Sequence, residues 1–131
     1  RPVHLMAFGG PGELENLVLK KGHVGLEKLL RFLAMGFNGG TDFDTPLLYA
    51  MSLLEDQAWG KADVLVVTDG QCIPTPLVVE EVNAAKLKNG ARIWSVVFGR
   101  NWEQGVGPFS DKVWTIDARN AALGLGFLRR L

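Results

Sequence analysis

The chain has 131 residues, enough for one domain of ordinary size with a buried core, and hydrophobic residues make up 47% of it. Fourteen basic side chains balance fourteen acidic ones without a basic cluster, so an extended nucleic-acid interface is not expected. No apolar run is long enough to cross a bilayer and no basic-then-apolar leader is present, which predicts a soluble, cytoplasmic protein. Cys72 is the only cysteine, which excludes an intrachain disulfide and a cysteine-based zinc site.

The first third of the chain predicts two strands and a helix. Residues 2–8 are expected to form a strand ended by the glycine-rich turn 9–12, and residues 13–20 alternate loosely, as in a weaker edge strand. Apolar residues recur at helical spacing over 25–35, which predicts an amphipathic helix with its apolar stripe in the core. The stripe consists of Leu26, Leu29, Leu30, Leu33 and Phe37.

Two later helices begin with similar capping chemistry. After a Gly-Gly-Thr-Asp loop, Asp44 or Thr45 is expected to act as N-cap and Pro46 to take the first helical position, where its missing N–H costs nothing. A Thr-Pro pair at 75–76 opens another helix, which is expected to end at Gly90.

The remaining segments predict buried strands. Residues 63–68 are a run of aliphatic, mostly β-branched side chains, as in a strand covered on both faces, and strands are also expected over 91–99 and 112–117. A glycine-rich loop through Pro108, expected to be mobile, separates the last two strands, and residues 118–131 predict a terminal helix. This alternation predicts an α/β fold with a doubly wound, mostly parallel sheet flanked by helices, as in Rossmann-like proteins.

Two short stretches are candidates for a binding site. Asp69 and Gly70 fall at the carboxyl end of the most hydrophobic predicted strand, where ligands bind in open α/β sheets because the loops of adjacent strands diverge there. Thr41 and Asp42 end the loop before the second helix. The alternative roles are local: Asp69 caps the next turn with Gly70 at positive φ, and Thr41-Asp42 forms an Asx turn at a helix start.

The two stretches also carry a family resemblance. Residues 37–43, Phe-Asn-Gly-Gly-Thr-Asp-Phe, and residues 62–70, Ala-Asp-Val-Leu-Val-Val-Thr-Asp-Gly, resemble motifs of the von Willebrand factor A (VWA) domain. The order of predicted elements resembles the carboxyl-terminal part of that domain over nearly the whole chain. Within the family, the two motifs are most similar to the bacterial stand-alone branch of ViaA-like and CoxE-like proteins, which typically work with MoxR-type AAA+ ATPases.

The resemblance implies a metal-ion-dependent adhesion site at the carboxyl edge of the sheet. It assigns Thr41 and Asp69 as ligands of a divalent cation, with Gly40, Asp42 and Gly70 as further residues of the site loops. Mg²⁺ suits such a site because it prefers hard oxygen ligands and retains water, which leaves a position for a carboxylate of a protein partner. The implied activity is binding, in an adaptor for the AAA+ ATPase, and not catalysis.

One family motif is missing from the chain. The first metal motif, Asp-x-Ser-x-Ser, follows a central strand in the family and would lie upstream of Arg1. We therefore expect residues 1–131 to be a single VWA-like domain that is incomplete at its amino-terminal end and lacks the first strand and helix. Two consequences are weak or absent Mg²⁺ binding by this chain alone, and self-association through the gap left by the strand.

The alternative function is a Mg²⁺-dependent hydrolase or phosphoryl-transfer enzyme on a similar sheet, with Asp69 as metal ligand or nucleophile. The sequence contains no Walker A loop, no Gly-x-Gly-x-x-Gly after a strand and no second carboxylate closely spaced with Asp69. These absences favour the interaction module over the enzyme.

Overall fold

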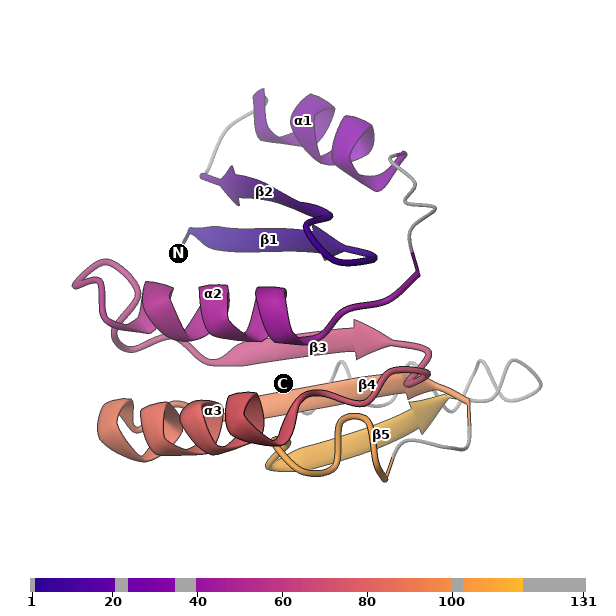
Figure 1. Cartoon of the computed structure of the whole chain (residues 1–131). Coiled ribbons are helices and arrows are strands. Elements are labelled where there is room, and N and C mark those ends of the chain that lie inside the picture. Colours follow the sequence, from indigo (N-terminus) through magenta and orange to yellow (C-terminus); the bar gives the residue numbers. More distant parts are fainter. Residues whose placement is uncertain (1, 21–23, 35–39, 100–102, 117–131) are drawn as a thin grey trace. The chain divides into compact units, whose positions relative to one another are not determined.

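Figure 1 shows the chain as a computed structural model, which describes residues 2–20, 24–34, 40–99 and 103–116. The chain divides into two compact units, Arg1–Pro46 and Leu47–Leu131. The positions of the units relative to one another are not determined, so each unit is described by itself.

The first unit begins with a β-hairpin. Strands β1 (Val3–Phe8) and β2 (Leu14–Leu19) pair antiparallel over all six residues of each strand. The turn between them is closed by the Gly10 N–H, which donates to Glu13 Oε2 at 2.7 Å, while Gly12 takes a φ of 79° that a side chain would disfavour. Both expected strands are confirmed.

Helix α1 (Val24–Leu33) confirms the predicted helix but not its burial. Leu26 and Leu30, expected in the core, are exposed. Helical spacing brings them to one face, but a small unit offers such a face little to pack against, and β2 is the main neighbour of α1. Glu27 and Arg31 form an exposed ion pair at 2.7 Å, which adds only a few tenths of a kcal/mol to helix stability.

Helix α2 (Asp44–Leu54) starts earlier than expected. The Asp42 carboxylate caps it, since Oδ1 accepts from the Asp44 N–H at 2.9 Å and Oδ2 from Thr45 Oγ1 at 2.6 Å. The prediction of Asp44 or Thr45 as N-cap is therefore wrong, because both residues already lie inside the helix. Pro46 falls in the first turn, where its missing N–H still has no intrahelical carbonyl to lose.

The second unit contains a three-stranded parallel sheet. Strands β3 (Val64–Thr68), β4 (Ile93–Phe98) and β5 (Lys112–Ile116) are hydrogen-bonded in that order. The expected parallel sheet is confirmed for these strands, so the unit has an α/β architecture. Its buried apolar side chains are Leu47, Ala50, Met51, Leu54, Val78, Val82, Ala91, Ile93, Val96, Val97, Val106 and Phe109.

Helix α3 (Pro76–Asn89) connects β3 to β4 and has the predicted ends. Thr75 is the N-cap in an extended conformation, the following proline opens the helix, and Gly90 closes it with a φ of 67°. Near the carboxyl end of α3, Lys88 pairs at 3.1 Å with Glu55, the residue that follows α2. This pair joins the carboxyl end of α2 to α3.

The helix expected over 118–131 lies outside the described residues. None of the helices that the structure describes combines the length and the hydrophobicity needed to cross a bilayer.

Candidate functional site

Asp69 lies where the sequence predicts, directly after β3 at its carboxyl end, and its side chain is exposed. Asp69 Oδ1 accepts a hydrogen bond from the Gln71 N–H at 3.0 Å, which makes an Asx turn. Gly70 has a φ of 77°, and its N–H donates to Thr68 Oγ1 at 3.1 Å. The local turn roles are thus confirmed for Asp69 and Gly70.

The turn leaves acceptor capacity on the Asp69 carboxylate. An ionised carboxylate has about four lone-pair positions, and the turn occupies one of them. Within the part of the chain that the structure describes, Gln71 N is its single donor and no basic side chain pairs with it. Asp69 therefore retains oxygen lone pairs for a cation or for a donor group of a partner.

The loops that leave β3 and β4 pack backbone against backbone. A Cβ built on Gly105 would lie 2.7 Å from Cys72 O and 2.8 Å from Gly70 O, and one on Gly99 would lie 3.5 Å from Asp69 O. Gly105 is buried, so this part of the glycine-rich loop is a packed element of the site. The backbone around Gly105 and Gly99 therefore lies directly beside the turn that carries Asp69.

The second predicted stretch lies in the first unit. Gly40 has a φ of 93°, Thr41 is exposed, and the Asp42 carboxylate is engaged at the start of α2. The helix-start role of Asp42 is thus confirmed. Thr41 belongs to the first unit and Asp69 to the second, so their predicted meeting in a metal site stays a prediction.

The described residues contain no group of three or more His, Cys, Asp or Glu side chains arranged to hold a metal ion. Thr41 and Asp69 would supply one neutral and one charged oxygen, whereas Mg²⁺ takes about six ligands in octahedral geometry and keeps several waters. Both residue types fit Mg²⁺ chemically, and the remaining protein ligands would have to come from elsewhere.

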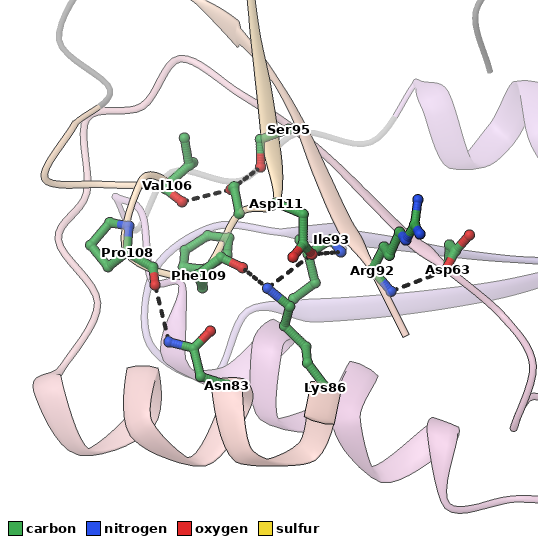
Figure 2. Close-up of polar contacts among 11 residues, drawn as sticks. Asp63, Asn83, Lys86, Arg92, Ile93, Ser95, Val106, Pro108, Phe109 and Asp111 are labelled. Atoms are coloured by element: carbon green, nitrogen blue, oxygen red, sulfur yellow. Dashed lines mark hydrogen bonds and ion pairs between the residues drawn. The ribbon is translucent and has the colours of Figure 1, made fainter. Parts of the chain in front are cut away.

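A part-buried polar network, not predicted from the sequence, supports the sheet at the end opposite to this site (Figure 2). Asp111 Oδ2 accepts from the Ile93 N–H at 2.7 Å and from Lys86 Nζ at 2.9 Å, and Lys86 Nζ also donates to Phe109 O at 2.7 Å. The Lys86 side chain is only 11% exposed, so its charge needs these partners. The network joins α3 to the amino ends of β4 and β5, and its role is structural.

The network shifts the ionisation of Asp111. Burial acts to raise the pKa of Asp111, but the hydrogen bond from Ile93 and the hydrogen bond and charge of Lys86 outweigh it, so the pKa lies below its ordinary value of 3.8. A lowered pKa means that the folded state favours the carboxylate. The resulting stability is fully present above the unfolded-state pKa and is lost as the pH falls through the folded-state pKa.

We therefore expect Asp111→Asn to lower the free energy of unfolding at neutral pH by about 1–2 kcal/mol, because a charge-assisted acceptor becomes a neutral one at a part-exposed position. The difference between wild type and variant should shrink as the pH falls below about 4. Urea denaturation at a series of pH values measures this difference in the free energy of unfolding. Glu80→Gln, which neutralises an exposed carboxylate on α3, is the control and should show no comparable gap. A gap that stays constant from neutral to acid pH would contradict the linkage.

The site thus has one exposed carboxylate above the carboxyl end of a parallel strand, on a turn beside the neighbouring loop. Such a group can bind a cation, or accept hydrogen bonds from a partner. No protein-family model matches the chain.

Proposed function

We propose that this chain is the carboxyl-terminal part of a VWA-type protein-interaction module. In this proposal Asp69 and Thr41 contribute oxygen ligands to a Mg²⁺ site that an acidic side chain of the partner completes. The observation that carries the proposal is the exposed Asp69 carboxylate, which has no basic partner among the described residues and lies at the ligand-binding edge of a parallel sheet.

The sheet arrangement supports the proposal. Among the described strands, β1 pairs only with β2 and β3 only with β4, so each of these two strands has one edge without a strand beside it. The VWA resemblance requires an additional strand that carries the first metal motif, and both edges are compatible with it. The ligands missing around Asp69 would come from that strand, which makes this chain alone a weak Mg²⁺ binder.

The partner follows from the same resemblance. A MoxR-type AAA+ ATPase is the proposed partner, and the module acts as its cytoplasmic adaptor without catalysing a reaction itself. An acidic residue of the ATPase would occupy the open coordination position of Mg²⁺.

The decisive variant is Asp69→Ala in the full-length protein that contains this chain. We expect it to lose Mg²⁺-dependent binding of the ATPase while the protein stays folded, because the side chain is exposed and outside the core. Thr41→Val should weaken binding less, since a neutral ligand is lost and the carboxylate remains. Pull-down of the ATPase with Mg²⁺ or with EDTA measures binding, and thermal melting checks the fold.

Asp56→Ala is a matched control for Asp69→Ala. Asp56 is also exposed, and its Oδ1 accepts from the Ala58 N–H at 2.9 Å in the same kind of turn, but it does not follow a strand. It should cost the same small amount of stability and leave binding intact. If Asp69→Ala binds the ATPase as the wild type does and EDTA has no effect, the metal bridge is wrong.

A further inference from the structure

Strand β3 forms one edge of the three-stranded sheet, because β4 is its only partner among the described strands (Figure 1). The Val64 N–H donates to the carbonyl of Arg92, the residue before β4, at 2.9 Å. Backbone groups of successive residues point alternately to the two sides of a strand, so those of Leu65 and Val67 point away from β4. No residue in the described ranges hydrogen-bonds to them there. Such an edge is a template for another strand.

The charges at the two ends of this edge are opposite. Lys61 precedes β3 and Asp69 follows it, and both side chains are exposed. Neither forms an ion pair with a residue that the structure describes. Between them, Leu65 and Val67 are 45% and 52% exposed and lie on one face of the strand. When a second copy of this edge is turned end for end, its negative end therefore meets the positive end of the first.

We propose that a second copy of the chain pairs its β3 antiparallel with this β3, with Leu65 opposite Leu65 of the other copy. Opposite residues are then equally far from Leu65, so Lys61 lies opposite Asp69 of the other copy at both ends. About six backbone hydrogen bonds can form in this register. The side chains of Leu65 and Val67 from both copies share one face and cover one another.

Charge and backbone geometry select this register over its neighbours. Centring the pair on Val66 would set Asp63 opposite Asp69 of the other copy at both ends, and like charges directly opposite destabilise a ladder. Centring it on Val67 would draw the turn after Asp69 into the ladder, where Gly70 has a φ of 77° that does not continue a strand. The register centred on Leu65 avoids both conflicts.

The expected dimer is weak and depends on protein concentration. The edge of a five-residue strand buries less surface than the roughly 1,200 Å² at the lower end of stable interfaces. An additional strand on this edge, which the proposed function allows, would replace the second copy. The test therefore uses the chain of 131 residues without the ATPase and in the presence of EDTA, so that its outcome is independent of the metal bridge.

Sedimentation velocity under reducing conditions measures the monomer–dimer equilibrium over a range of concentrations. Lys61→Glu and Asp69→Lys should each raise the dissociation constant of the dimer about tenfold, because two opposite-charge pairs per dimer become like-charge pairs. The double variant should restore the wild-type constant, since the charges are then exchanged. Glu80→Lys, which changes an exposed carboxylate on α3, is the control for net charge and should have little effect. Thermal melting checks that each variant is folded.

Crosslinking tests the register. In a Cys72→Ser background, Leu65→Cys should crosslink rapidly to the other copy with a short thiol-specific reagent. Val67→Cys is the matched control on the same face, because the two cysteines would lie about 13 Å apart along the strands, four residues at about 3.3 Å each. A chain that stays monomeric at high concentration, a folded double variant that fails to restore the dimer, or faster crosslinking through Val67→Cys would overturn the proposal.

Discussion

Replacing Phe109 by alanine is expected to lower the free energy of unfolding by about 3–5 kcal/mol, the cost typical of deleting a fully buried aromatic ring. Phe109 is only 1% exposed, and it lies in the loop before β5 that α3 holds. Its carbonyl accepts from Lys86 Nζ, and that backbone bond is retained in the variant. The loss therefore reports the cavity left by the ring. Urea denaturation of the wild type and the variant measures it.

Leu87→Ala is the control for Phe109→Ala, because Leu87 on α3 is 88% exposed and its truncation removes little buried surface. It should change stability by less than about 0.5 kcal/mol. Similar losses in the two variants would contradict the assignment of Phe109 to the core.

Gly105→Ala is expected to destabilise the second unit by about 1–3 kcal/mol, as in other overpacked positions. The added Cβ would lie 2.7 Å from Cys72 O and 2.8 Å from Gly70 O, and both are backbone atoms that cannot rotate away. Relief requires a shift of the Gly105 loop, of the turn that carries Asp69, or of both. The variant should therefore also weaken Mg²⁺-dependent partner binding in the full-length protein, although Gly105 contributes no ligand.

Thermal melting and the ATPase pull-down measure the two effects of Gly105→Ala. Gly60→Ala is the control, since a Cβ at Gly60 would meet its nearest atoms at 3.4 and 3.5 Å, close to ordinary contact. That variant should change stability little and leave binding unchanged. A Gly105→Ala protein as stable as the Gly60→Ala protein would show that the loop yields without cost.

The elements that the sequence predicts best are those set by local chemistry. Thr75, the proline after it and Gly90 mark the ends of α3, because capping preferences act within one turn of the chain. The aliphatic run of β3 likewise forms the expected strand, but its expected burial on both faces is wrong, because Leu65 and Val67 are exposed. In these places local propensity and the final structure agree.

The sequence is less informative where contacts with other parts of the chain determine the local structure. Helical spacing identifies the apolar side of α1 but does not say whether anything covers Leu26 and Leu30. At α2, Asp42, Asp44 and Thr45 are all acceptable residues at a helix start, and the path of the chain selects Asp42. The pair between Lys86 and Asp111 depends on the register of β4, which no local pattern reveals.

The candidate site likewise has one part that the sequence predicts and one part that it does not. The position of Asp69 at the end of β3 follows from a strand boundary, and the structure agrees with it. The packing of Gly105 against that turn involves a residue 35 positions after Gly70 (105 − 70), and a glycine-rich loop gives no signal of a specific contact. The sequence therefore predicts the position of the carboxylate but not the loop contact that supports it.

The pairing pattern of the strands also has a consequence for folding kinetics. The β1–β2 hairpin closes through a short turn and can form in about 1–10 μs. In the parallel sheet, Asp63 and Arg92, the partners next to β3 and β4, are 29 residues apart, so loop-closure entropy must be overcome before the ladder forms. Until then the uncharged run Val64–Thr68 lacks its β4 partner, and such a run is prone to intermolecular pairing. During synthesis, the interval between the emergence of β3 and the docking of β4 is thus a period in which a chaperone that shields this strand would suppress aggregation.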